Sequence, residues 1–254
     1  MCEQETRSQQ GLPFGSIDFD FTNLEIKRAS LSMLCDACQQ DAIGFYYNAL
    51  LSFLEGCEQL NKRQYSWAIV KLYYTVYYCA RAQMGFHNFL VLRKGNKLFG
   101  LHLIEGAKPH KCNGRNDHNT ILELYKRDYS ANYILSNTIN GVKYPDYMMD
   151  IRETTNYKQQ SMKEPYRLDL FDDLDDKIKA DKTTAMVLEE WLADQNVYCF
   201  QENSAYLVTT YIMLKETAAI YKGLPNRMST SQSKYIQKLL TQSKMKRFET
   251  DVLS

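Results

Sequence analysis

The sequence predicts a mainly α-helical protein with one small β insertion, and three observations lead to this prediction. Apolar residues recur at three- and four-residue spacing over long stretches, which is the pattern of helices with one buried stripe. Residues 88–105 change to short apolar runs on both sides of Gly95-Asn96, the pattern of a β-hairpin. Hydrophobic residues make up 44% of the 254 residues, which is enough to build a folded core.

An N-terminal arm over residues 1–29 precedes two predicted helices. Within the arm, residues 17–21 alternate apolar and acidic side chains, which predicts a short strand or an extended docking segment. A helical stripe begins near Ser30 and ends before a turn at 61–63, and a second helix covers 64–85. Because the connection is so short, the two helices are predicted to pack as antiparallel neighbours.

The chain is predicted to become helical again after the hairpin. A loop over 106–117 leads to helical patterns at 118–130 and 145–160. Six aspartates within 169–181 predict an acidic hinge or an exposed helix start, and one long helix is predicted over 183–222. The predicted fold is therefore a helical bundle with an inserted β-hairpin and a C-terminal helical extension.

The last segment, residues 224–254, is predicted to be a basic amphipathic tail that follows a helical domain over 30–223. The tail holds six Lys or Arg residues against two Asp or Glu residues, and they alternate with apolar side chains. Such a segment is typical of a helix that docks on a protein partner or makes a weak nucleic-acid contact. The basic residues predicted to make this contact are Lys238, Lys244, Lys246 and Arg247.

Composition and missing motifs exclude several classes of protein. The net charge of +1 carries no whole-chain signature of nucleic-acid binding, so any such contact must come from a local patch. No apolar run approaches the roughly 20 residues of a membrane span, and the polar start is unlike a signal peptide, so we expect a cytoplasmic protein. The motifs of P-loop NTPases, dinucleotide enzymes, serine hydrolases and zincins are all missing, and no cofactor is expected.

A Cys-x2-Cys pair at Cys35 and Cys38 suggests half of a zinc site. The pair lies on a predicted helix, and the other candidate ligands have a spacing unlike that of a zinc knuckle, so free buried thiols are the predicted state. These other candidates lie in a loop over 108–118 that is also basic, so the loop is interpreted either as a phosphate contact or as a solvated loop. The other candidate ligands are His110, Cys112 and His118.

Two stretches resemble a known family. Residues 73–78 hold four tyrosines in six positions of the second predicted helix, and Arg152 precedes Asn156-Tyr157 on a later one. Together they resemble the HEPN superfamily, a helical-bundle group of prokaryotic ribonucleases and nucleotide-binding proteins. In that family a tyrosine-rich helix packs beside a helix carrying Arg-x4-6-His. The resemblance covers about residues 30–85 and 145–160 of this chain.

The resemblance implies a site at Arg152. In an active member of the family, an RNA 2′-hydroxyl attacks the adjacent phosphate without a metal; histidine moves the proton and arginine stabilises the phosphate charge. Here Tyr157 stands at the histidine position, and a phenol with a pKa of about 10 is a poor base at neutral pH. Arg152, Asn156 and Tyr157 are the candidate catalytic residues, and the alternative is that Arg152 anchors the structure by pairing with Glu153 or a neighbouring helix. A second spacing of this kind, Arg81 to His87, is interrupted by Gly85 and is interpreted as a coincidence.

Three functions follow from the resemblance. The first is a non-catalytic interaction subunit of a multi-protein prokaryotic (anti-phage) defence complex, which binds a larger ATPase or nuclease through Tyr74, Tyr78 and the tail. The second is a metal-independent HEPN-type ribonuclease toxin that cleaves RNA through Arg152 and Asn156, with Tyr157 or His87 in place of the usual base. The third is a nucleotide- or RNA-sensing module that uses the same pocket without cleavage.

Overall fold

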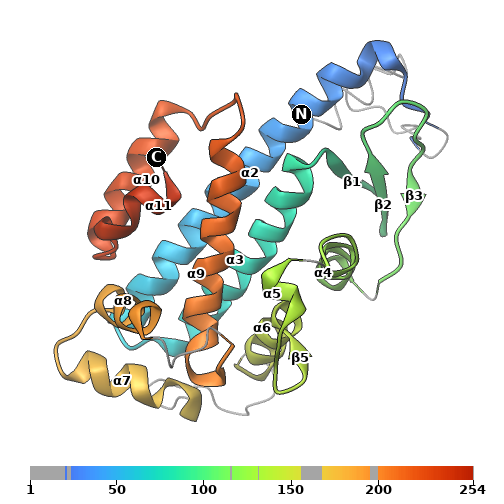
Figure 1. Ribbon diagram of the computed structural model, residues 1–254. Helices are drawn as coiled ribbons and strands as arrows, with labels where there is room; N and C mark the ends of the chain where they lie inside the picture. The colour runs from blue at the N-terminus through green and yellow to red at the C-terminus, as the bar shows by residue number, and fades with distance from the viewer. Residues whose placement is uncertain are drawn as a thin grey trace.

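The computed structural model describes residues 21, 24–114, 116–130, 132–155, 168–194 and 200–253. This part of the chain is mainly α-helical, with a three-stranded antiparallel sheet and a separate small hairpin. Figure 1 shows α2, α3 and α9 side by side in the centre, with α4 to α6 on one side and the C-terminal helices on the other. Within the described residues, none of the helices combines the length and the apolarity needed to cross a membrane.

The elements, in chain order, are α2 (Arg28–Asn61), α3 (Tyr65–Phe86), β1 (Phe89–Lys94), β2 (Lys97–His102), β3 (His110–Lys111), α4 (Asp117–Asp128), α5 (Tyr133–Ser136), β4 (Thr138–Ile139), β5 (Val142–Lys143), α6 (Tyr144–Glu153), η2 (Asp169–Phe171), α7 (Asp172–Lys179), α8 (Thr184–Ala193), α9 (Glu202–Lys222), α10 (Thr230–Gln242), η3 (Lys246–Phe248) and α11 (Glu249–Val252).

Helices α2 and α3 pack closely against one another and confirm the two predicted antiparallel helices. Lys71 of α3 pairs with Glu55 of α2 at 2.5 Å, whereas the end of α3 meets the first half of α2 at Gly85 and Ala42. These two contacts run in opposite order along the helices, so the helices are antiparallel. A Cβ atom on Gly85 would lie 2.7 Å from the Cβ atom of Ala42, which shows why this crossing needs a glycine.

The predicted hairpin is confirmed as β1 and β2. Lys94 pairs with Lys97 across the turn, and Gly95 has a φ of +58°, a left-handed conformation that glycine adopts without strain. The sheet has a third strand that was not predicted, because β3 is only two residues long and lies within the predicted loop over 106–117. One face of the sheet packs on the start of α2 and forms a second core, which includes Phe21, Leu34, Leu90, Leu92, Phe99 and Leu101.

One other prediction is wrong, and one further element was not predicted. The single long helix predicted over 183–222 is wrong: α8 ends at Ala193, Asp194 has extended backbone angles, and α9 begins at Glu202. The apolar pattern continues on both sides of this break, and polar residues interrupt it from Asp194 onward. At its start, α8 is capped by Thr183, whose hydroxyl accepts a hydrogen bond from the Met186 amide. The hairpin of β4 and β5 was not predicted. The alternating stretch before Phe21 and the end of the helix predicted over 145–160 lie outside the described residues.

The C-terminal segment packs on this chain's own helices. Its apolar side is buried in the main core with α2 and α9, and the Tyr46 hydroxyl donates to the Val252 carbonyl at 2.5 Å. The amphipathic pattern was therefore correct, and the apolar face that it describes is used within the chain. The buried residues of this face are Ile236, Leu239, Leu240, Met245, Phe248 and Val252.

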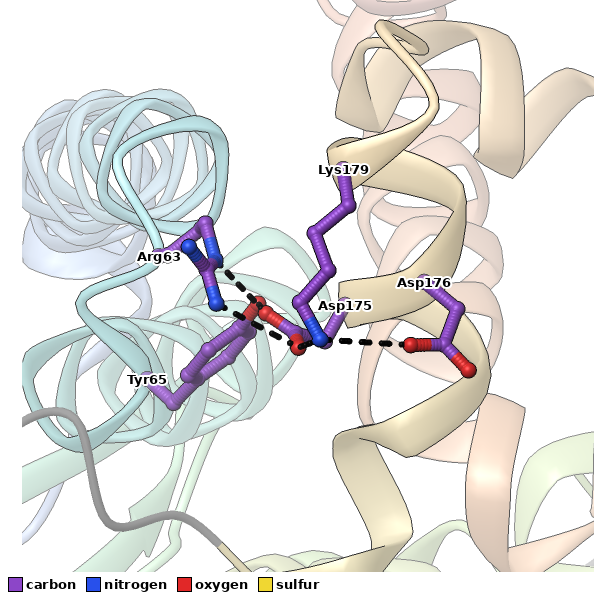
Figure 2. Close-up of polar contacts among 5 residues, drawn as sticks. All are labelled: Arg63, Tyr65, Asp175, Asp176 and Lys179. Carbon is purple, nitrogen blue, oxygen red and sulfur yellow. Dashed lines mark hydrogen bonds and ion pairs between the residues drawn. The ribbon is translucent and has the colours of Figure 1, made fainter.

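The acidic segment contains one buried aspartate among exposed ones. Asp175 in α7 is fully buried and accepts hydrogen bonds from Arg63 Nε at 2.7 Å and from the Tyr65 hydroxyl at 2.6 Å. Lys179 Nζ lies 2.7 Å from the same carboxylate, and Figure 2 shows it between Asp175 and Asp176. The segment therefore fastens α7 to the turn between α2 and α3, in addition to providing the exposed helix start that was predicted.

Candidate functional site

Arg152 and His118 approach one buried tyrosine, Tyr73, from two different helices. Arg152 lies near the end of α6, and its guanidinium carbon is 4.5 Å from the centroid of the Tyr73 ring. His118 lies in the first turn of α4, where Asn116 caps the helix, and its Nδ1 atom is 2.8 Å from the Tyr73 hydroxyl. Tyr73 thus contacts the cation through its ring and the imidazole through its hydroxyl.

The surroundings of His118 and Tyr73 set their protonation states. Tyr73 is fully buried, His118 is half-buried, and the Arg152 side chain is 16% exposed. Burial lowers the pKa of His118, and the positive charge of Arg152 lowers it further, so the imidazole is neutral at pH 7. Burial raises the pKa of Tyr73 although Arg152 opposes this, so the phenol keeps its proton.

Two buried polar atoms at the end of α6 and just after it have no hydrogen-bond partner among the described residues. The Nε atom of Arg152 is buried without a hydrogen bond, and so is the Oγ1 atom of Thr155 three residues later. The ion pair of Arg152 with Glu153 spans 3.7 Å, which is too long for a hydrogen bond. Buried polar atoms of this kind are costly to leave unmatched. Both atoms are donors that suit an oxygen-rich anion such as a phosphate.

Three half-buried tyrosines, Tyr74, Tyr77 and Tyr78, form an aromatic face on α3 that we call the tyrosine belt. The Tyr77 ring lies 4.4 Å from the His118 ring, between centroids, and the Tyr74 ring lies 5.7 Å from it. Tyr74 stacks on Tyr78 at 5.8 Å. The predicted binding residues Tyr74 and Tyr78 therefore lie beside the site, whereas Tyr73 serves both the site and the core.

The structure separates the other candidates from this site. Asn156 and Tyr157 lie outside the described residues. The basic residues of the C-terminal segment are exposed, and α10 and α11 lie on the far side of α9 from α4 and α6 (Figure 1). Two of them are paired with acids, Lys246 with Glu249 and Arg247 with Glu189. The remaining two are Lys238 and Lys244.

Arg81 and His87 are not brought together. Arg81 lines a cavity between α2 and β1, whereas His87 follows the end of α3 and lies against the Tyr129 ring at 5.6 Å. The two side chains therefore line different hollows, as expected for a coincidental spacing.

The described residues contain no cluster of three or more His, Cys, Asp or Glu side chains placed to hold a metal ion. Cys38 and Cys112 are buried free thiols, and burial raises the pKa of the Cys112 thiol. His118, which was weighed as a zinc ligand, is engaged by the tyrosines of α3 instead.

His118 is the candidate site residue that sequence patterns did not connect with Arg152. The two residues are far apart in the chain, and no spacing rule joins the first turn of α4 to the last turn of α6. The available signal was indirect: a histidine two residues after an Asn cap, and a helix with more tyrosines than one core face needs. No family model, curated protein or solved structure matches the chain.

Proposed function

We propose that the chain binds RNA at Arg152 and His118 and cleaves it without a metal ion. One observation carries this proposal: the Arg152 guanidinium lies on the ring of Tyr73, whose hydroxyl holds the imidazole of His118 at 2.8 Å. An arginine and a histidine are the groups that the HEPN resemblance implies, and here they come from two helices. The packing of the tyrosine-rich α3 against α6 supports a HEPN-like bundle.

His118 has the properties of a general base in this reaction. In the tautomer with its proton on Nδ1, the imidazole donates to the Tyr73 oxygen, and Nε2 accepts the proton of an RNA 2′-hydroxyl. The 2′-oxygen then bonds to the adjacent phosphorus while the bond from phosphorus to the 5′-oxygen breaks. The imidazolium returns the proton to the leaving oxygen, which yields a 2′,3′-cyclic phosphate and a 5′-hydroxyl end.

Arg152 stabilises the charge that develops on the phosphate oxygens. Its guanidinium lies on the Tyr73 ring, and its Nε has no hydrogen-bond partner among the described residues, which leaves that N–H free to donate to a phosphate oxygen. Thr155, three residues further along the chain, can donate a hydrogen bond from its unmatched hydroxyl. In this scheme Tyr157 is not required as the base, and Asn156 and Tyr157 stay predicted substrate contacts.

The test is cleavage of single-stranded RNA by the purified full chain in excess EDTA. We expect cleavage that yields cyclic phosphate ends, and a loss of about 10²- to 10⁴-fold in rate for His118→Gln and for Arg152→Ala. His87→Gln is the matched control, because this exposed histidine lies outside the site. RNA that stays intact, or variants that cut as fast as the parent, would refute the proposal, provided that thermal unfolding shows each variant folded.

A second function, the interaction subunit of a prokaryotic defence complex, is favoured by a row of aromatic side chains along one face of α3. Trp67 is 64% exposed and shares a helix face with Lys71, Tyr74 and Tyr78, which follow it at four, seven and eleven residues. Rigid aromatic side chains on a helix are typical anchors of protein interfaces. The partner proposed for this row is a larger ATPase or nuclease.

Co-expression with the genomic neighbours and affinity purification test this second function. A stoichiometric partner should remain bound to the parent chain and be lost in Trp67→Ala. Tyr133→Ala is the matched control, since Tyr133 is 54% exposed on α5, away from the row. A chain that purifies alone, or a complex indifferent to Trp67, contradicts the subunit role.

A further inference from the structure

A cavity of about 550 Å³ lies between α2, the second half of α3 and strand β1. Helix α2 contributes Asp41 and Phe45, α3 contributes Tyr77 and Arg81, and five consecutive residues of β1, 89–93, form the opposite wall. The volume is within the range of small-molecule sites. Its lining combines aromatic rings with a cation, a carboxylate and backbone groups, which is the mixture that a planar heterocycle with donors and acceptors requires.

Arg81 lines this cavity and lies over an aromatic ring. Its guanidinium carbon lies 4.3 Å from the centroid of the Phe45 ring, and the guanidinium interacts with the Tyr77 side chain. The carboxylate of Asp41 attracts it from the facing turn of α2. An arginine fixed in this way offers both a stacking plane and several N–H donors.

Strand β1 adds backbone groups to the same cavity. In the part of the chain that the structure describes, β1 is the edge of its sheet, with β2 on its other side. Lys94 pairs with Lys97 next to the turn, and pairs alternate along the hairpin, so Val91 and Arg93 point their N–H and C=O groups away from β2. These groups can bond to the edge of a bound base.

The cavity adjoins the proposed RNA site. Tyr77 separates the two: its ring lies 4.4 Å from the His118 ring, and its side chain interacts with Arg81. Asp117 lines the cavity and directly precedes His118 in α4. A nucleotide with its phosphate at His118 therefore has the cavity within reach of its base.

A row of stacked planar groups leads into the cavity. Tyr74 stacks on Tyr78 at 5.8 Å, Tyr78 stacks on Phe45 at 6.4 Å, and Arg81 covers Phe45 at the end of the row. Successive aromatic faces of this kind bind the bases of single-stranded nucleic acid with little regard to sequence. This stack of planar groups makes an unpaired nucleic-acid strand a better occupant of the cavity than a protein segment.

We propose that this cavity receives one base of single-stranded RNA whose neighbouring phosphate lies at Arg152 and His118. The inference rests on the proposed function, because it takes the same RNA as its ligand. It assigns Arg81, Asp41 and the edge of β1 to recognition of that base. The inserted hairpin then has a role, since it supplies one wall of the cavity.

The test is an affinity scan with short single-stranded RNA in which one nucleotide at a time is abasic. The 2′-hydroxyls are methylated, so that cleavage does not interfere, and the full chain is titrated with each RNA. One abasic position should bind about 10- to 100-fold more weakly than the parent RNA. Arg81→Ala should weaken the parent RNA to a similar degree and remove the penalty at that position, because the two changes delete one contact.

Two controls keep the result interpretable. Arg127→Ala removes an arginine that pairs with Asp128 outside the cavity, and it should preserve the abasic penalty. Asp41→Asn tests the same cavity with almost unchanged side-chain volume, in case Arg81→Ala does not fold. It should weaken the parent RNA more than the abasic RNA.

The outcomes separate this inference from the proposed function. If the parent RNA does not bind, or binds regardless of Arg152→Ala, the proposed function fails and the base site fails with it. If binding needs Arg152 but the scan is flat, or Arg81→Ala retains the penalty, only the base site is overturned. It is also overturned if a protein partner, and not RNA, protects the Val91 and Arg93 amides from hydrogen exchange, because the edge of β1 would then bind a peptide.

Discussion

The hydroxyl of Tyr73 and the Nδ1 atom of His118 lie 2.8 Å apart, which joins the core of the bundle to its candidate site. Tyr73 is fully buried in α3, so its ring cannot move without disturbing the packing of the helix. The same ring supports the guanidinium of Arg152 at 4.5 Å. One rigid side chain therefore contacts both Arg152 and His118, and in the proposed reaction Tyr73 is a positioning residue.

Replacing Tyr73 with phenylalanine should separate its two contacts. The ring and its contact with Arg152 remain, but the bond to His118 is lost. We expect RNA cleavage about 10- to 100-fold slower, with a stability loss of about 1 kcal/mol. Tyr125→Phe is the matched control, since it removes another buried hydroxyl, which donates to Gln83 away from the site. A Tyr73→Phe rate equal to that of Tyr125→Phe would show that the hydroxyl has no role in the reaction.

The pKa of His118 should lie below the ordinary histidine value of about 6.5 and rise toward it in Arg152→Gln. Burial lowers this pKa first and the charge of Arg152 second, so the substitution removes only part of the shift. NMR titration of the imidazole measures both values. The acidic limb of the pH profile of the cleavage rate should move to higher pH in the same variant, because the base must be neutral to accept a proton.

The same depressed pKa has a consequence for folding. The unfolded chain binds a proton at His118 at a pH where the folded chain does not, so the unfolded state gains stability as protons are added. The contribution of His118 to stability is therefore present above about pH 6.5 and is lost as the pH falls through the lower, folded value. A His118 signal that titrates at the ordinary value in the parent chain would contradict the assigned environment.

Local patterns predicted the parts of this fold that depend on neighbouring residues. Helices α2 and α3 follow from their apolar stripes, and β1 and β2 follow from the turn at Gly95 and Asn96. The break between α8 and α9 was missed because apolar residues continue on both sides of it. The two-residue strand β3 has no pattern of its own and exists because β2 offers it an edge.

The candidate site was predicted only in part, for the same reason. Arg152 and the tyrosines of α3 were identified from a short motif and an unusual composition. His118 joins them because α4 and α6 both pack on α3, and this arrangement depends on tertiary contacts that no local spacing encodes. Asp175 is a parallel case, since its burial under Arg63 and Tyr65 cannot be distinguished in sequence from the exposed aspartates around it.

Asp175→Asn should destabilise the chain by about 1 to 3 kcal/mol, because the amide cannot satisfy all three groups that converge on the buried carboxylate. The loss is limited because Arg63 and Lys179 are about half exposed and recover water. Urea unfolding measures it. Asp176→Asn is the control: Asp176 also pairs with Lys179, at 3.4 Å, but it is 73% exposed and should change stability little. Equal effects of the two substitutions would show that burial of Asp175 does not matter.

Alanine substitutions at two glycines of the central helices should have opposite effects. At Gly85 the new Cβ atom would lie 2.7 Å from that of Ala42, so α2 and α3 must separate, and we expect a loss of about 1 to 3 kcal/mol. At Gly44, in the middle of α2, nothing lies within 4 Å of the new atom, so the gain in helix propensity should stabilise the chain by about 0.5 to 1 kcal/mol. Thermal and urea unfolding of both variants measure the difference in sign. A Gly85→Ala chain as stable as the parent would mean that the two helices do not cross as closely as the contact between Gly85 and Ala42 requires.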